Sequence, residues 1–336
     1  YKRQGEDKME TILSVHDLCI QYEMQDGIVK ALNGVDFELE EGSSHGLVGE
    51  TGAGKTTMAK GIMGLTPKPY GKIKSGEILY HGKDLLKMST KELRKIRGEH
   101  ISMIFQDPMT SLNPVITVGD QIAEAVETHQ KCSWRQAEQR VREILELVGI
   151  APERATDYPH QFSGGMKQRV VIGIALACNP KVLIADEPTT ALDVTIQAQV
   201  LETIADLRKK LNTALLLITH DLGVVAQNCE YVSVIYAGEI VESGTVHDVF
   251  KKQMHPYTEG LFSSIPNIHE HVERLGPIPG LMPDPTALPE GCAFCERCPY
   301  AQERCKQEHP PIYHVGGETG RHQVRCFRCE GKEGQV

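Results

Sequence analysis

The chain has 336 residues, which predicts about two domains at roughly 150 residues each. Lysine and arginine total 36 and aspartate and glutamate total 45, so the formal net charge is −9. This acidic balance excludes the overall positive field that is typical of nucleic-acid-binding proteins. No apolar run approaches the ~18 residues that span a membrane, and the charged N-terminal residues contain no signal-peptide core.

The chain begins with residues 1–10, which we expect to be disordered; we expect residues 1–8 to be foreign to the native protein, with Met9 as the native start. The segment 11–40 alternates apolar and polar residues loosely, as strands of an antiparallel layer do. Helical periodicity is present at 134–148, behind Ser133, and again after Asp193. Five short apolar runs predict buried strands: 44–48, 101–105, 181–185, 214–218 and 231–235. Strands and helices that alternate in this way predict an α/β fold with a largely parallel sheet.

A glycine-rich segment follows the predicted strand 44–48. Residues 49–56 read Gly-Glu-Thr-Gly-Ala-Gly-Lys-Thr and match the pattern G-x-x-x-x-G-K-[ST]. The glycines let backbone N–H groups approach phosphate oxygens, and the following helix adds its N-terminal partial charge. Lys55 can reach the β- and γ-phosphates, and the Thr56 hydroxyl can ligate Mg²⁺. We therefore expect a nucleoside triphosphate to be bound by Gly49, Glu50, Thr51, Gly52, Ala53, Gly54, Lys55, Thr56 and Thr57.

A second motif lies at 181–187, where an apolar run ends in Asp186 and Glu187. The strand would place the Asp186 carboxylate at the C-terminal edge of the sheet, near the Mg²⁺ of the glycine-rich loop. Glu187 can then face an attacking water as its general base. Together the two motifs predict a P-loop nucleoside triphosphatase.

The type of P-loop protein is indicated by residues 162–169, which read Phe-Ser-Gly-Gly-Met-Lys-Gln-Arg. This run resembles the signature of the ATP-binding cassette (ABC) family. Ser163, Gly164 and Gly165 would leave the N-terminus of a helix open to a phosphate. The resemblance implies that this phosphate belongs to the nucleotide of a partner subunit, so that two cassettes enclose two ATP molecules.

Four further positions match the family in the expected order. The resemblance implies that Tyr22 stacks on adenine and that Gln106 senses Mg²⁺, water and the membrane partner. Asp193 would end the D-loop, in which Thr190 stands where serine is common. His220 would contact the γ-phosphate.

The resemblance covers about residues 11–250 and implies an architecture as well as roles. It implies an ABC nucleotide-binding domain at 11–255, with a parallel core sheet, an antiparallel β layer and a helical subdomain at about 107–178. The implied catalytic residues are Lys55, Glu187 and His220, and the implied Mg²⁺ ligands are Thr56, Gln106 and Asp186.

Two stretches indicate which class of ABC protein this is. Residues 103–114 resemble the corresponding loop of dipeptide, oligopeptide and nickel importer ATPases, and the residues His-Pro-Tyr-Thr at 255–258 resemble the segment after their cassette. The alternative is a soluble ABC ATPase of DNA repair or translation. Such proteins usually carry two cassettes or a coiled-coil insertion, whereas this sequence has one P-loop and no heptad run.

The importer resemblance implies a set of partners and a location. We expect ATP hydrolysis to power uptake of dipeptides or oligopeptides through two transmembrane permease subunits. A second ABC ATPase, identical or different, and an extracytoplasmic substrate-binding protein complete the expected assembly. The chain would lie peripherally on the cytoplasmic face of the cell membrane. Nickel and glutathione remain alternative substrates.

Ten prolines between residues 256 and 311 argue against long helices and central strands, so 256–336 is expected to be an irregular C-terminal extension. It contains six of the ten cysteines: Cys292, Cys295, Cys298, Cys305, Cys326 and Cys329. Disulfides, zinc and an iron–sulfur cluster are three possible explanations. A reducing compartment argues against disulfides. The two C-x-x-C pairs suit zinc except for their long separation, and the Cys-Pro at 298–299 is typical of iron–sulfur sequences.

The importer ATPases commonly end in Gly-Cys-x₅-Cys-Pro followed by two further cysteines, and in some members this set holds a [4Fe–4S] cluster. The resemblance implies that a cluster is held here by Cys292, Cys298, Cys305 and Cys326, with Zn²⁺ as the runner-up. Cys295 and Cys329 are then extra. A metal clip would supply folding energy that a short proline-rich segment lacks. The nearby histidines that could replace a cysteine are His309, His314 and His322.

Overall fold

The computed structural model describes residues 10–106, 108–190, 193–264, 278–317 and 320–332. The chain folds into two compact units, each built from several segments. The first unit contains Tyr1–Ser14, Glu38–Ser44 and Ile78–Ile218, and the second contains Val15–Phe37, His45–Glu77 and Thr219–Val336. The disorder expected at the N-terminus stays a prediction because residues 1–9 lie outside the described part.

This division places the glycine-rich loop and the whole C-terminal extension in the same unit. The segment 107–178, expected to form a helical subdomain, belongs to the other unit together with residues 181–187. Neither unit ends at residue 255, so this division does not test the expected domain boundary there, which stays a prediction.

Three parallel strands form the sheet of the first unit. Strand β7 (Val182–Asp186) pairs with β6 (Ile101–Ile104) on one side and with β8 (Ala214–Thr219) on the other. Every residue of these strands is buried, which explains why their sequences are continuous apolar runs without alternation. The parallel strands predicted at these places are confirmed to within a residue of their ends.

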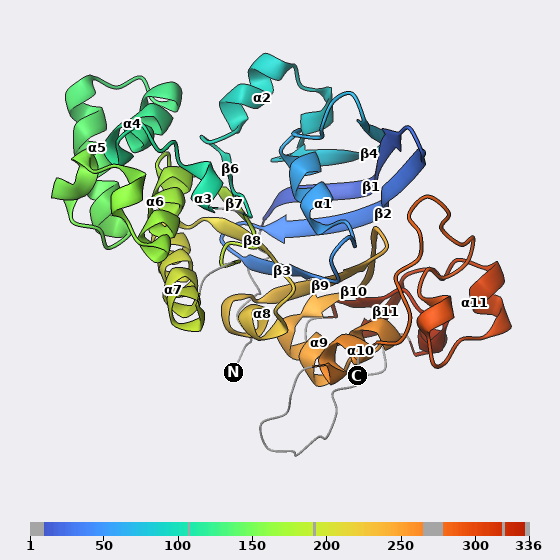
Figure 1. Cartoon of the computed structure of the whole chain (residues 1–336). Helices are drawn as coiled ribbons and strands as arrows, with labels where there is room; N and C mark the ends of the chain where they lie inside the picture. Colours follow the sequence, from blue (N-terminus) through green and yellow to red (C-terminus); the bar gives the residue numbers. More distant parts are fainter. Residues whose placement is uncertain (1–9, 107, 191–192, 265–277, 318–319, 333–336) are drawn as a thin grey trace, which may run out of the picture. The chain divides into compact units, whose positions relative to one another are not determined.

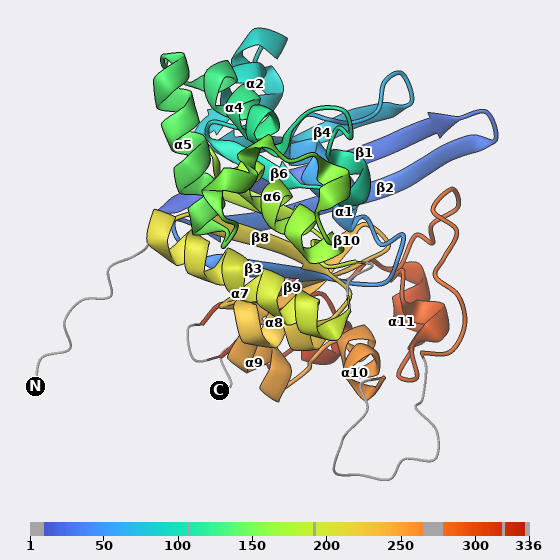
Figure 2. The same ribbon diagram turned by 60° about the vertical axis from the view of Figure 1, so that its left-hand side comes forward.

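Helices make up most of the rest of this unit, and Figure 2 shows α4, α5 and α6 side by side. The helix predicted behind Ser133 is confirmed: the Ser133 N–H donates to Gln136 Oε1 at 2.8 Å and so begins α5. Its buried face repeats at three- and four-residue spacing, which is the signal that predicted it. The helices are α2 (Thr90–Ile96), α3 (Pro108–Ser111), α4 (Val118–His129), α5 (Trp134–Leu147), α6 (Gly164–Leu176) and α7 (Val194–Leu211).

The second unit contains a sheet that is parallel at one end and antiparallel at the other (Figure 1). Strand β3 (Ser44–Val48) pairs in parallel with β9 (Tyr231–Tyr236), and β10 (Glu239–Thr245) pairs antiparallel with β9. Strand β12 (His322–Val324) pairs antiparallel with β10, and β11 (Tyr313–Gly316) pairs antiparallel with β12. The order in this unit is β11-β12-β10-β9-β3.

The strand that precedes the glycine-rich loop and the last two strands of the extension therefore share one sheet. The expectation that the whole extension 256–336 is irregular is wrong for β11 and β12, and also for the short helices α10 (Pro256–Ser263) and α11 (Glu303–Gln307). For the two strands the physical reason is local, because the last proline is Pro311 and the residues after it keep the backbone N–H groups that a strand needs.

The segment 11–40 forms two long strands, β1 (Thr11–Met24) and β2 (Gly27–Glu40). A two-residue turn joins them, which only antiparallel neighbours allow. Strand β4 (Gly71–Tyr80) follows β1 in the order β2-β1-β4, and its end pairs antiparallel with β5 (Lys83–Asp84). The antiparallel layer predicted from the loose alternation is confirmed.

Aromatic side chains form part of the core of the second unit. The ring of Tyr236 lies 4.5 Å from that of Tyr257 and 5.2 Å from that of Phe294, measured between centroids. Phe294 comes from the extension and is 2% exposed, so the extension contributes to this core despite its prolines. The helices of this unit are α1 (Lys55–Ile62), α8 (Leu222–Asn228), α9 (Val246–Lys251), α10 (Pro256–Ser263) and α11 (Glu303–Gln307).

Within the described ranges, none of the helices has both the length and the apolar character that crossing a bilayer requires.

Candidate functional site

The glycine-rich loop lies between the end of β3 and the start of α1, as the motif predicts. The Lys55 ammonium is buried and donates to the carbonyl oxygens of Gly49 at 2.7 Å and Glu50 at 3.0 Å. A Cβ on Gly49 would lie 2.2 Å from the Ile235 carbonyl oxygen, so only glycine fits there. Gly54 has a φ of 108°, a conformation that side chains disfavour. The loop is therefore closed around the lysine, the arrangement that presents backbone N–H groups to phosphate.

Tyr22 lies beside the first turn of α1. Its hydroxyl donates to Thr57 Oγ1 at 3.3 Å, and the ring is half-buried. The structure therefore brings the aromatic residue expected to bind adenine next to the helix that follows the glycine-rich loop. Stacking on adenine stays a prediction.

The second motif places two adjacent carboxylates in different surroundings. Asp186 is the last residue of β7 and is 2% exposed. Glu187 leaves the strand with a φ of 46°, a left-handed conformation that costs a non-glycine residue about 1–3 kcal/mol. Its N–H donates to the Ile218 carbonyl oxygen at 2.9 Å. The strand and the turn thus separate the expected Mg²⁺ ligand from the expected general base.

Two side chains hold the Glu187 carboxylate. Gln106 Nε2 donates to Glu187 Oε2 at 3.1 Å, and Thr190 Oγ1 donates to the same oxygen at 3.0 Å. Three residues that the family resemblance singled out are therefore in direct contact. The Thr190 hydroxyl makes a hydrogen bond that the more common serine could also make.

The signature residues open α6, as predicted. Ser163 is its N-cap and accepts from the Met166 N–H at 3.4 Å. A Cβ on Gly165 would lie 2.5 Å from Ile196 Cγ2 on α7, so this glycine permits the close approach of the two helices. Asp193 caps α7 by accepting from the Ile196 N–H at 3.0 Å. Residues 191 and 192 of the expected D-loop lie outside the described residues.

The predicted ATP-site residues are distributed over both units. Tyr22, residues 49–57 and His220 belong to the second unit, and Gln106, the signature, Asp186, Glu187 and Asp193 belong to the first. His220 follows β8, and the next residue, Asp221, caps α8. The Mg²⁺ site and the catalytic set each need residues of both units, so they stay predictions.

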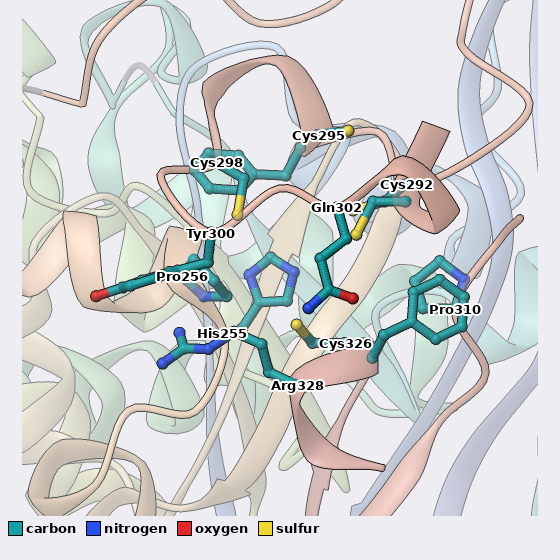
Figure 3. Close-up of a pocket in the computed structure, with 13 residues that line it drawn as sticks. His255, Pro256, Cys292, Cys295, Cys298, Tyr300, Gln302, Pro310, Cys326 and Arg328 are labelled. Carbon is teal, nitrogen blue, oxygen red and sulfur yellow. The ribbon is translucent and has the colours of Figure 1, made fainter. Parts of the chain in front are cut away.

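The extension contains a pocket lined by five of its six cysteines, which we call the cysteine pocket (Figure 3). All four predicted cluster ligands line it: Cys292, Cys298, Cys305 and Cys326. Figure 3 shows the sulfur atoms of Cys292, Cys298 and Cys326 pointing into a common space. The sulfur of Cys295 points away from that space.

Cys329 does not line the pocket. It is 1% exposed and packs in a small apolar cluster with Tyr313, Val315, Val324 and Phe327. It therefore serves as a small buried apolar residue.

The cysteine pocket strongly disfavours bare thiolates. Burial raises the pKa of the Cys292 thiol to about 12, and burial is also the main reason that the pKa values of Cys298 and Cys326 are raised. These thiols are neutral at pH 7 unless a cation replaces their protons. The ten cysteines are free, so the disulfide alternative is not realised.

The structure also bears on whether the cysteine pocket can hold a metal ion. In the part of the chain that the structure describes, no three or more His, Cys, Asp or Glu side chains are arranged to hold a metal ion. A single tetrahedral ion with bonds of about 2.3 Å needs its four sulfurs close together, so the zinc alternative has no support here. None of the three histidines considered as substitute ligands lines the pocket: His309, His314 and His322.

Several residues around these sites were not predicted from the sequence. Arg297, between Cys295 and Cys298, donates to both carboxylate oxygens of Glu50, at 2.9 and 3.0 Å. The Glu50 N–H donates to the Tyr257 hydroxyl at 2.8 Å. His255 lines the cysteine pocket, and burial lowers its pKa to about 3, so it is neutral. The contacts to Glu50 join residues more than 200 positions apart, and no sequence pattern marks such pairs.

Comparisons with known proteins identify the family of the chain. A family model described as "ABC transporter" matches residues 32–190, and one described as "Oligopeptide/dipeptide transporter, C-terminal region" matches residues 241–305. The solved dimeric, post-hydrolysis structure of the ATP-binding cassette MJ0796 with ADP and Pi has a TM-score of 0.62 and 27% identity, over 70% of this chain and 98% of that one.

Two curated relatives match nearly the whole chain. The oligopeptide transport ATP-binding protein OppD of Bacillus subtilis (strain 168) is 52% identical over 92% of this chain and 87% of its own. The dipeptide transport ATP-binding protein DppD of the same organism is 49% identical over 95% of each. The chain is an ABC-type ATPase, and it belongs to the oligopeptide/dipeptide family of ABC transporter ATP-binding proteins.

Proposed function

We propose that this chain hydrolyses ATP to power the import of dipeptides or oligopeptides through a membrane permease. The observation that carries the proposal is the fold itself, in which a closed glycine-rich loop shares one unit with the extension matched by the peptide-transporter family model. The names of the relatives at about 50% identity support the substrate class. Nickel and glutathione are alternative substrates that a transport assay distinguishes.

In the proposed mechanism, Lys55 and His220 neutralise charge on the γ-phosphoryl group as it is transferred to water. Glu187, held by Gln106 and Thr190, orients that water and accepts its proton, so that the products are ADP and phosphate. Thr56, Gln106 and Asp186 would hold Mg²⁺, which supplies positive charge to the phosphate oxygens when bound. Tyr22 would carry the adenine.

A partner cassette would complete the site. The N-terminus of α6, with Ser163 and two glycines, offers backbone N–H groups to a phosphate. In the proposed assembly this helix contacts the nucleotide of a second ATPase subunit, and the dimeric form of the MJ0796 cassette supports such a pairing. Two permease subunits and an extracytoplasmic binding protein are further proposed partners. The chain would then lie on the cytoplasmic face of the membrane.

For the cysteine pocket we propose a [4Fe–4S] cluster held by Cys292, Cys298, Cys305 and Cys326. The support is that these four residues line one pocket and that their donor atoms are all sulfur. Because burial raises the pKa values of Cys292, Cys298 and Cys326, a cluster that binds here would have to displace their protons. When bound, the cluster would supply a covalent clip between segments that the chain separates by more than twenty residues.

Reconstitution tests the transport proposal. The chain would be placed with its permease, its partner ATPase and the binding protein in proteoliposomes that enclose ATP and Mg²⁺. Labelled dipeptides and oligopeptides are expected to enter, whereas the Glu187→Gln variant should give no uptake. If nickel or glutathione is taken up and peptides are not, the substrate is that solute and the peptide proposal is wrong. ATP hydrolysis that responds to DNA or ribosomes, and not to the permease, would overturn the importer proposal in favour of a soluble ATPase.

A further inference from the structure

Glu50 carries a negative charge within the loop that is expected to receive the triphosphate. An unpaired carboxylate there would repel the phosphates, which are strongly anionic. The structure pairs this carboxylate with Arg297 in a two-point ion pair of 2.9 and 3.0 Å. The Arg297 side chain is 6% exposed and that of Glu50 is 30% exposed, so water screens this pair less than a surface pair.

Further hydrogen bonds fix the guanidinium group of Arg297. Its Nε donates to the Pro279 carbonyl oxygen at 3.0 Å, and NH1 also donates to the Tyr236 hydroxyl at 3.3 Å. NH2 approaches the Ile278 carbonyl oxygen at 3.4 Å in addition to Glu50. Each of the five guanidinium N–H groups therefore has an acceptor, which fixes the plane of the group.

A second contact holds the backbone of Glu50. Its N–H donates to the hydroxyl of Tyr257, which is fully buried. The Tyr257 N–H in turn donates to His255 Nδ1 at 3.1 Å at the start of α10. The Glu50 carbonyl oxygen accepts from Lys55 at 3.0 Å, so a shift of Glu50 would also shift the support of the phosphate-binding lysine.

Arg297 and Tyr257 do not line the cysteine pocket themselves, but residues next to both of them do. Arg297 is the last residue of the short helical turn Cys295–Arg297. The next residue, Cys298, caps this turn, and its N–H donates to the Cys295 carbonyl oxygen at 3.3 Å. His255, Cys295 and Cys298 all line the pocket. A change in the positions of these cysteines would therefore displace Arg297, and Arg297 bonds directly to the glycine-rich loop.

We propose that Arg297 is a positioning residue of the nucleotide site, which neutralises and fixes Glu50 and so makes ATP affinity depend on an intact cysteine pocket. The inference rests on the proposed phosphate site at the glycine-rich loop. It assigns the extension a role in ATP binding in addition to its place in the fold.

A charge-removal series on the full chain tests the proposal through the KM for ATP and kcat measured separately. Arg297→Gln should raise the KM for ATP by about tenfold with little change in kcat, because a charged hydrogen-bonded pair is lost. Arg304→Gln is the matched control, since Arg304 also precedes a pocket cysteine but pairs with Glu308 and Glu330. It should leave the KM unchanged.

The decisive variant is the double replacement Glu50→Gln with Arg297→Gln. If Arg297 acts by neutralising Glu50, a neutral glutamine in place of that glutamate removes the repulsion, and the double variant should have a clearly lower KM for ATP than Arg297→Gln. A residue that only packs the extension would not be rescued in this way, so a double variant as weak as Arg297→Gln overturns the proposal. An unchanged KM in Arg297→Gln overturns it as well.

Lys55→Met separates this inference from the phosphate site on which it rests. If Lys55→Met loses ATP binding while Arg297→Gln binds normally, the phosphate site stands and the role of Arg297 is wrong. If Lys55→Met binds ATP normally, the phosphate site itself fails.

The dependence on the cysteine pocket has its own readout, because coupling between two sites acts in both directions. Saturating ADP with Mg²⁺ should slow iodoacetamide labelling of Cys295, followed by mass spectrometry, by about fivefold or more in the wild type; Cys295 is not a proposed cluster ligand and lies in the turn that carries Arg297. Arg304→Gln should behave in the same way, whereas Arg297→Gln should show equal rates with and without nucleotide. Equal rates in the wild type overturn the connection to the pocket.

Discussion

The carboxylate of Glu187 and the residue Glu50 are both held by other residues, but these partners come from very different places in the chain. Glu187 is held by Thr190, three residues away, and by Gln106 of the same unit. Glu50 is held by Tyr257 and Arg297, which follow it by 207 and 247 residues. The first arrangement belongs to the cassette, and the second exists only when the extension is folded against the glycine-rich loop. The comparison suggests that the cassette itself holds the proposed catalytic base, whereas the extension adds the proposed control of nucleotide affinity.

The largest effect is expected at Glu187. Replacing it with glutamine keeps the contacts to Gln106 and Thr190 possible but removes the group that accepts a proton from water. ATP turnover should fall by about 10³-fold while ATP binding is kept, because loss of a general base affects the chemical step. Single-turnover hydrolysis and equilibrium binding of ATP measure the two effects separately. Near-normal turnover would show that the local carboxylate is not the base.

The next prediction concerns the other side of the comparison, where the extension supports Glu50. Anaerobically purified protein should be brown, with absorption near ~400 nm and about four irons per chain. Cys326→Ser should lose the absorption and the iron and unfold at a lower temperature, since the metal contributes folding energy. Cys295→Ser is the control, because its sulfur points away from the shared space, and it should keep both. A colourless protein that contains zinc would contradict the cluster.

The smallest effect is expected at Thr190. It tests whether the Thr190 hydroxyl helps to position the Glu187 carboxylate. Thr190→Val removes the hydroxyl that donates to the carboxylate and should lower kcat by about tenfold, since one hydrogen bond to a charged group is lost. Thr190→Ser retains the hydroxyl and should retain kcat. Equal rates in the valine and wild-type proteins would mean that the Thr190 hydroxyl does not position the base.

The parts of the site that could be predicted from the sequence are those whose physics is local. Position 49 requires glycine because a Cβ there would lie 2.2 Å from a backbone oxygen, and a motif of eight residues captures that requirement. Asp186 and Glu187 follow from one buried strand and its end. Residues with this kind of local cause have a fixed spacing, so a sequence pattern can find them.

The rest depended on contacts between distant segments. Arg297 is a single charged residue among cysteines, and nothing in its neighbours indicates Glu50 as its partner. Cys329 has the C-x-x-C spacing of a metal ligand, yet it packs among apolar side chains. Its neighbours in that cluster are set by the tertiary fold, which the spacing does not indicate. Strands β11 and β12 are four and three residues long, too short to show a period of two.

The pairing of β12 with β10 has a consequence for the solubility of the chain. β10 would otherwise present a row of unpaired N–H and C=O groups, and such a strand edge recruits strands from other molecules. β12 covers part of that row with Glu242↔Val324 and Ser243↔Gln323, and leaves only the short β11 at the border. We therefore expect a form that lacks β12 to expose this edge of β10 and to aggregate more readily.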